Sequence, residues 1–138
     1  MAGLNKNTPR PTGIVLHARS RQLEVSFEDG KTFKLPFEFL RVYSPSAEVQ
    51  GHGPGQEVLQ VGKKDVEITD IEPVGNYAIK PIFSDGHASG IYSWDILYAL
   101  GSDQDGLWAQ YLSALEQAGA SRLSAPPASN LDVTEIRR

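Results

Sequence analysis

Apolar and polar residues follow nearly the same order in two stretches of the chain that lie 56 residues apart. Residues 23–30 alternate apolar and polar side chains and end in Asp29-Gly30, and residues 79–86 resemble them, with Phe83 at the place of Phe27 and Asp85-Gly86 at the end. A period of two is typical of a strand with one buried face. Asp-Gly is typical of a two-residue hairpin turn, because glycine accepts the positive φ that such turns require. The pattern therefore predicts two similar β-hairpins.

Each predicted hairpin is followed by a short apolar segment. Leu35 in the first return strand matches Ile91 in the second, for which we expect residues 87–91. After one inserted residue, Phe37-Glu38-Phe39-Leu40 aligns with Trp94-Asp95-Ile96-Leu97. The repeat is therefore a hairpin followed by a short helix.

The boundaries of the two short helices have distinct signals. Pro36 suits the first turn of a helix, where its missing N–H costs nothing, and this helix is expected to continue to about Val42. Ser93 can cap the second helix and Gly101 can end it.

A longer helix is expected near the C-terminus, from Asp103 or Asp105 to Gly119. Apolar residues recur within it at spacings of three and four, which defines one face; they are Leu107, Trp108, Tyr111, Leu112 and Leu115. Trp108 is a candidate anchor for a partner protein, although aromatic residues on such a face more often pack in the core.

The remaining segments complete the predicted organisation. Ile14-Val15-Leu16 begins the first strand, residues 66–71 alternate as a further strand, and the residues 44–57, with three glycines, are expected to form a loop. These elements predict an α+β fold: two antiparallel β-hairpin-plus-short-helix units side by side, with a C-terminal helix. We expect one domain.

The domain boundaries follow from composition. A single domain is expected over residues 13–119, with a disordered arm over residues 1–12 and a disordered tail over residues 120–138, because both ends are polar and contain prolines.

Composition excludes several function classes. The net charge is −4, which argues against general binding to nucleic acid or to an anionic membrane surface. The chain has no cysteine, which excludes disulfides, thiolate chemistry and a self-contained Cys-ligated zinc or iron–sulfur site. The N-terminus has no apolar signal-peptide core, and no apolar run reaches membrane-spanning length, so we expect a cytoplasmic protein.

The three histidines are the candidate chemical residues. His87 stands where the first hairpin has Lys31, and it is either a metal ligand or proton carrier, or an ordinary polar hairpin residue. His52 lies in a glycine-rich loop that could serve as a docking surface, and His17 lies in the first strand. Their spacing does not force them together, and no Gly-x-Ser-x-Gly elbow indicates a serine hydrolase.

Several segments together resemble a known family. They are residues 23–30, the segment Leu40-Arg41-Val42-Tyr43-Ser44-Pro45-Ser46, residues 83–97 and the ending of residues 107–122. Over residues 13–122 the chain resembles the gamma-butyrobetaine hydroxylase-like N-terminal domain, a domain of unknown function (DUF971), in its short bacterial stand-alone form.

The resemblance implies a zinc site whose ligands have changed. In the hydroxylases the domain precedes an iron- and 2-oxoglutarate-dependent catalytic domain, and three cysteines and one histidine hold a structural zinc. On this chain those positions are Ser44, Ser46, Val49 and His87. Hydroxyls and a valine cannot replace thiolates around zinc. We therefore expect no zinc or other cofactor, no catalytic domain and no enzymatic activity.

The chain also resembles a C-terminal extension of some P-loop iron–sulfur cluster carriers, which implies a connection to cluster assembly. The preferred interpretation is a non-enzymatic interaction module, an accessory to iron–sulfur cluster or iron-enzyme proteins, that contacts another protein. The alternative is a metal-binding protein or orphan enzyme that uses His87 with His17 or His52.

Overall fold

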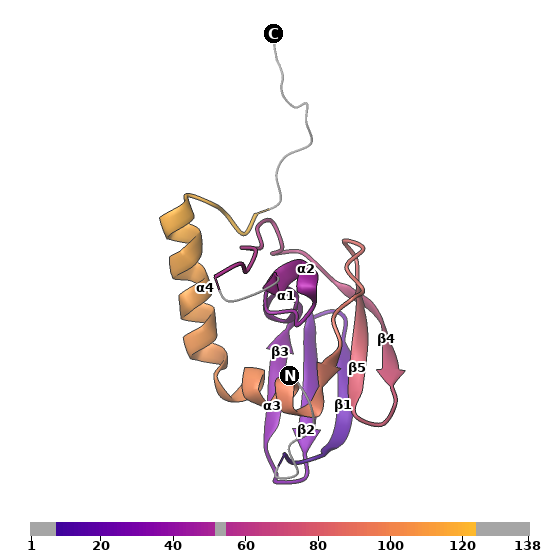
Figure 1. The fold of residues 1–138 in the computed structure, drawn as a ribbon. Helices are drawn as coiled ribbons and strands as arrows, with labels where there is room; N and C mark the ends of the chain where they lie inside the picture. Colours follow the sequence, from indigo (N-terminus) through magenta and orange to yellow (C-terminus); the bar gives the residue numbers. More distant parts are fainter. Residues whose placement is uncertain (1–7, 52–54, 124–138) are drawn as a thin grey trace.

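Two three-stranded antiparallel sheets form the framework of the molecule (Figure 1). The computed structural model describes residues 8–51 and 55–123. The strands of the first sheet, in the order β1-β2-β3, are Pro11–His17, Gln22–Phe27 and Thr32–Pro36, and those of the second, β4-β5-β6, are Ile68–Val74, Ala78–Phe83 and Tyr92–Ser93. The helices are α1 (Phe37–Val42), α2 (Ala47–Gln50), α3 (Trp94–Ser102) and α4 (Gln104–Ala118).

Each sheet is followed directly by a helix, so the chain contains the unit twice. The hairpin β2-β3 leads into α1, and the hairpin β5-β6 leads into α3. Figure 1 shows α4 as a separate long helix at one side of the molecule. This arrangement confirms the predicted α+β fold of two hairpin-plus-helix units with a C-terminal helix.

The two hairpin turns have the same geometry, but they are three-residue loops. In the first, the Phe27 amide donates to the Lys31 carbonyl at 2.8 Å, and the Gly30 amide donates to the Phe27 carbonyl at 3.0 Å. In the second, the Phe83 amide donates to the His87 carbonyl at 2.9 Å. The turn glycines have φ of +89° and +91°. The prediction of two-residue turns was wrong, because the glycine occupies the bulge position after a three-residue loop.

The strand register corrects one detail of the predicted repeat. Leu23 pairs with Leu35, whereas the equivalent Ile79 pairs with Tyr92. The extra residue of the second unit therefore precedes Tyr92, so Tyr92 and not Ile91 matches Leu35. Tyr92 is fully buried and Ile91 is 44% exposed. None of the predicted return strand, residues 87–91, forms a strand, and β6 covers only Tyr92–Ser93.

The boundaries of α3 depend on tertiary contacts. Ser93 occupies the predicted N-cap position, but its hydroxyl donates to the Asp95 carboxylate and caps no backbone amide. Gly101 does not end α3, which continues one residue further. A Cβ at Gly101 would lie 2.3 Å from the Phe33 ring, so the glycine allows α3 to pack closely on β3.

Side chains of both sheets and of α1 and α3 form the main apolar core. Its fully buried large members include Leu23, Leu35, Phe37, Phe39, Leu40, Phe83, Tyr92 and Leu97. A smaller cluster joins Val42 of α1 to Tyr111 and Leu115 of α4. On α4, Leu112 is 41% exposed, so the apolar face of this helix is narrower than predicted. Gly119 ends α4 in the left-handed conformation, as predicted.

Other segments differ from the predicted boundaries. Residues 44–57 are not only a loop, because α2 forms within them, with Ser46 as its N-cap. β1 begins at Pro11, inside the range expected to be an unpacked arm. Past the expected end of the domain, the Ser121 carbonyl accepts from the Gly62 amide at 3.0 Å. The residues that form these contacts therefore lie outside residues 13–119 at both ends.

Candidate functional site

His87 lies after the second hairpin turn with its side chain only 2% exposed. Both ring nitrogens have partners. Nδ1 lies 2.9 Å from Glu48 Oε1, and Nε2 lies 2.8 Å from Ser44 Oγ. The ring also packs against Phe83, with 5.9 Å between the ring centroids. The two hairpin residues that the sequence aligns therefore differ: Lys31 is exposed, and His87 is buried.

The environment of His87 favours the neutral imidazole. Burial lowers its pKa, the nearby charge of Arg41 lowers it further, and Glu48 opposes both effects. An ionised carboxylate can only accept a hydrogen bond, so Nδ1 of the neutral ring carries the proton and donates to Glu48. Nε2 then accepts from the Ser44 hydroxyl. The result is a line of three groups: hydroxyl, imidazole and carboxylate.

The segment that follows α1 is held against the second hairpin by hydroxyl groups. Ser44 is fully buried, and its Oγ accepts from the Ser46 amide at 3.2 Å. Ser46 Oγ lies 2.7 Å from Ser89 Oγ. A Cβ at Gly90 would lie 2.4 Å from Ser44 Oγ, so glycine permits this close approach. These contacts hold Ser44 and its neighbours against residues 87–90.

A second set of contacts surrounds the turn carboxylate next to His87. Asp85 Oδ2 accepts from Arg41 Nε at 2.9 Å and from Lys63 Nζ at 2.7 Å. Burial raises the pKa of Asp85, but the hydrogen bonds from Lys63, from the His87 amide and from Arg41 outweigh this effect and lower the pKa to about 2. Asp85 is therefore an anion that anchors the turn.

The other sequence candidates lie elsewhere. His17 Nε2 is 2.8 Å from Glu24 Oε1 at the surface of the first sheet, and His52 lies outside the described residues. Within residues 8–51 and 55–123, no three His, Asp or Glu side chains are grouped so that they could hold a metal ion. Trp108 is half-buried between Phe39, at 6.4 Å, and the Arg122 guanidinium, at 5.2 Å. Its indole is therefore largely engaged within the molecule.

Comparison with known families identifies the chain. Residues 14–98 match the family described as gamma-butyrobetaine hydroxylase-like, N-terminal. The chain belongs to this family. The expected family membership is therefore confirmed, and the matched family is named for the N-terminal domain and not for the catalytic domain of these hydroxylases.

Solved structures support the same membership. Two NMR solution structures are 46% and 49% identical in sequence to this chain. Their alignments cover 92% and 97% of this chain and 100% of the other chain, and both superimpose with a TM-score of 0.75. A crystal structure of a DUF971 protein of unknown function from Acidithiobacillus ferrooxidans is 38% identical. It covers 67% of this chain and 92% of that chain, with a TM-score of 0.57. No curated protein matches.

The four positions at which the resemblance places zinc ligands do not offer a zinc site in this chain. Ser44 and His87 are in direct contact, Ser46 is adjacent, and Val49 is buried on α2. A structural zinc needs four thiolate, imidazole or carboxylate ligands. The four positions offer one imidazole, with both nitrogens already hydrogen-bonded, two hydroxyls and an aliphatic group. They form a hydrogen-bonded contact between the two units.

The order of Ser44, His87 and Glu48 is that of a nucleophile, a base and an orienting acid. Their exposure is the reverse of what catalysis requires, because Ser44 is 0% exposed and the Glu48 side chain is 68% exposed. A nucleophile must meet its substrate, and in this arrangement Ser44 is not accessible to one. Glu48 was not among the residues that the sequence pattern singled out, although Ser46 followed by an acidic residue in the first helical turn is a helix-start signal.

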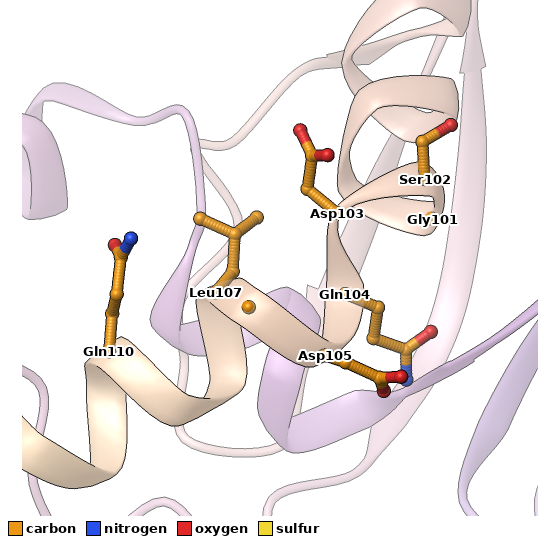
Figure 2. A pocket seen from close by; sticks show the side chains of 8 residues that line it. Gly101, Ser102, Asp103, Gln104, Asp105, Leu107 and Gln110 are labelled. Atoms are coloured by element: carbon orange, nitrogen blue, oxygen red, sulfur yellow. The ribbon is translucent and has the colours of Figure 1, made fainter.

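Two cavities lie away from this line. Figure 2 shows a cavity of about 560 Å³ at the junction of α3 and α4, where Asp103, Asp105 and Gln110 are among the lining residues. A groove of about 460 Å³ separates α4 from the segment around α2, and Val49, Leu59 and Tyr111 are among its lining residues. Neither cavity is lined by Ser44 or His87.

None of the helices in the described part of the chain combines the length and the apolar character that a membrane crossing requires.

Proposed function

We propose that this chain is a non-enzymatic protein-interaction module. The observation that carries the proposal is the exposure of three consecutive apolar residues on β1: Ile14 is 36%, Val15 48% and Leu16 37% exposed. Ile14 and Leu16 lie on one face of β1 and Val15 lies on the other, so both faces of this strand expose apolar side chains. Exposed apolar residues that gather in one place commonly mark interaction sites. The burial of Ser44 and His87 supports a function without catalysis, because the side chains that could act in catalysis are inaccessible, whereas the apolar side chains of β1 are exposed.

The partner class we propose is an iron–sulfur cluster carrier or an iron enzyme. Family membership supports this choice, since the domain resembles extensions of such carriers and precedes iron-dependent catalytic domains. The chain has no cysteine, so it would meet a carrier through its surface and would not supply thiolates to the cluster. The proposed role is docking, in the cytoplasm, without a resident cofactor.

The test is an NMR titration of the ¹⁵N-labelled full chain with the purified P-loop iron–sulfur carrier of the same organism. The carrier is added first without and then with its cluster. We expect saturable amide shifts that map to one contiguous surface. An unrelated P-loop protein of similar net charge serves as the control and should cause no shifts. Absence of shifts with both forms of the carrier would exclude this partner class.

A second candidate function is a metal-binding protein or enzyme centred on His87, and the Ser44–His87–Glu48 line is the observation that favours it. This function requires the segment after α1 to open, so that an ion or a substrate reaches the imidazole. Metal analysis of the purified chain separates the two candidates. Stoichiometric metal that is lost in His87→Ala would support this second function and contradict the first.

A further inference from the structure

The outer strands of the two sheets differ in how they are protected. β4 carries Asp70, Glu72 and Pro73, which are residues that discourage pairing with another strand. β3 is short and carries Lys34 and Pro36, and β6 has only two residues. β1 occupies the place in the first sheet that β4 has in the second. From Pro11 to Leu16 it has no charged residue.

β1 also leaves the apolar face of its sheet incomplete. Ile14 pairs with Val25, and Leu16 pairs with Leu23, so these two side chains lie on the face that forms the core. Val25 and Leu23 are fully buried, yet Ile14 and Leu16 remain more than one-third exposed. A further strand beside β1 would cover the exposed edge of this face.

The backbone of β1 has pairing capacity as well. Within residues 8–51 and 55–123, β1 pairs with β2 and with no other strand, from Pro11 to His17. In an antiparallel pair alternate residues direct their N–H and C=O groups away from the partner strand. Along the outer side of β1 these groups can therefore form a ladder with an added strand.

We propose that β1 binds an extended segment of a partner protein, which adds to the first sheet as a fourth strand and carries apolar residues flanked by carboxylates. This inference rests on the proposed interaction function and names the surface and the chemistry of the bound segment.

The charges at the two ends of β1 specify the flanking carboxylates. Arg10 precedes the strand and Arg19 follows it, and both are exposed. Among the described residues, neither guanidinium has an ion-pair partner; the nearby Glu24 pairs with His17, and Glu28 accepts from the Arg10 backbone amide. A segment with acidic residues at both ends of an apolar centre would place a carboxylate near each guanidinium.

The same charges disfavour a second copy of the chain as the occupant. Suppose that the β1 strands of two copies paired antiparallel, with Val15 of one copy opposite Val15 of the other. Arg19 of each copy would then lie near Arg10 of the other copy, so two arginines would meet at each end of the pair. Like charges opposite each other across a sheet are destabilising. A heterologous acidic segment removes this repulsion.

The test uses two synthetic peptides with the same Val-Thr-Val-Thr-Val centre. One peptide has two glutamates at each end, and the other has two lysines at each end. Each is titrated into the ¹⁵N-labelled full chain. We expect the acidic peptide to shift the amides of β1 and β2, and the basic peptide to bind at least about tenfold more weakly. Equal affinity, or shifts away from β1, would overturn the inference.

Variants of the full chain make the test site-specific. Val15→Lys places a charge at the centre of β1, on the face opposite to Ile14 and Leu16, and should weaken the shifts caused by the acidic peptide, whereas Leu112→Lys, at a similarly exposed apolar position on α4, should leave them unchanged. Arg10→Glu together with Arg19→Glu should reverse the preference between the two peptides, and Arg19→Glu alone should largely remove it. A dispersed spectrum confirms that each variant is folded. Equal loss in Val15→Lys and Leu112→Lys would contradict a site on β1.

Oligomeric state and carrier binding separate the remaining outcomes. A dimer of the full chain that becomes monomeric in Val15→Lys would assign β1 to a second copy and overturn the inference. If the iron–sulfur carrier binds with shifts confined to α4 or the groove beside it, the interaction function stands and the β1 inference fails. If the acidic peptide binds β1 but no carrier binds, the β1 inference stands and the proposed partner class fails.

Discussion

The Arg41 guanidinium at the fifth position of α1 donates to the Asp85 carboxylate in the turn of the other unit, with 2.9 Å between Nε and Oδ2. An equivalent contact joins α3 to the turn of the first hairpin. Tyr98, at the fifth position of α3, donates its hydroxyl to Asp29 in the first turn at 2.6 Å. Each helix of the repeat is therefore hydrogen-bonded to the hairpin turn of the other unit, and this pair of contacts connects the two units.

The Arg41–Asp85 and Tyr98–Asp29 contacts should contribute differently to stability. The side chain of Arg41 is only 9% exposed. Arg41→Ala therefore removes a buried partner of the Asp85 carboxylate and should lower the free energy of unfolding by about 3 kcal/mol. Tyr98→Phe removes the equivalent bond at the surface, where water replaces it, and the loss should be smaller. Urea unfolding of both variants measures the difference. Equal losses would show that burial does not determine the contribution of these contacts.

Protonation of His87 should reduce stability in mildly acidic solution. Its pKa is lowered in the folded state, so below about pH 6.5 the unfolded chain binds a proton at this residue that the folded chain does not. The stabilising contribution is complete above this pH and is lost as the pH falls towards the folded-state pKa. The free energy of unfolding should therefore rise with pH from the folded-state pKa of His87 up to about pH 6.5. His87→Gln should flatten this rise; an unchanged slope would mean that His87 is not its source.

Two glycines in consecutive helices should respond oppositely to the same substitution. Gly101→Ala should destabilise the protein by about 1–3 kcal/mol, because the new Cβ would overlap the Phe33 ring. Gly106 has open space around the position of a Cβ, so Gly106→Ala should stabilise α4 by about 0.5–1 kcal/mol. Thermal unfolding of the two variants gives the sign directly. Stabilisation by Gly101→Ala would contradict the close packing of α3 on β3.

Removal of metal ions should leave the fold intact. The positions at which the resemblance places zinc ligands provide only one imidazole, and hydrogen bonds to Ser44 and Glu48 engage both of its nitrogens. Incubation with a strong chelator should therefore not change the melting temperature or the amide spectrum. Release of stoichiometric zinc together with unfolding would show that the site has been interpreted incorrectly.

Local sequence signals were sufficient for the parts of the fold that depend on neighbouring residues. The Asp-Gly turns and the alternation around them predicted both hairpins, and Gly119 predicted the end of α4. The resemblance in sequence also pointed to Ser44 and His87 as neighbours, and the structure brings them within 2.8 Å.

Tertiary contacts decided the features that the sequence did not reveal. Gly101 has the pattern of a helix stop, but it is a packing position against Phe33. The predicted return strand is lost where Gly90 admits the Ser44 hydroxyl. α2 has only four residues, which is too short for helical periodicity to be visible, so Glu48 could not be assigned to His87. Each of these contacts joins residues that are distant in the sequence.

Calorimetry of carrier binding by two variants of the full chain separates a role of the β1 surface from a role of His87. If the module acts through an exposed surface and His87 is a structural residue, folded His87→Gln should bind the iron–sulfur carrier with the affinity of the original chain. Val15→Lys should bind it at least about tenfold more weakly. Loss of binding in folded His87→Gln, with full binding by Val15→Lys, would contradict this account.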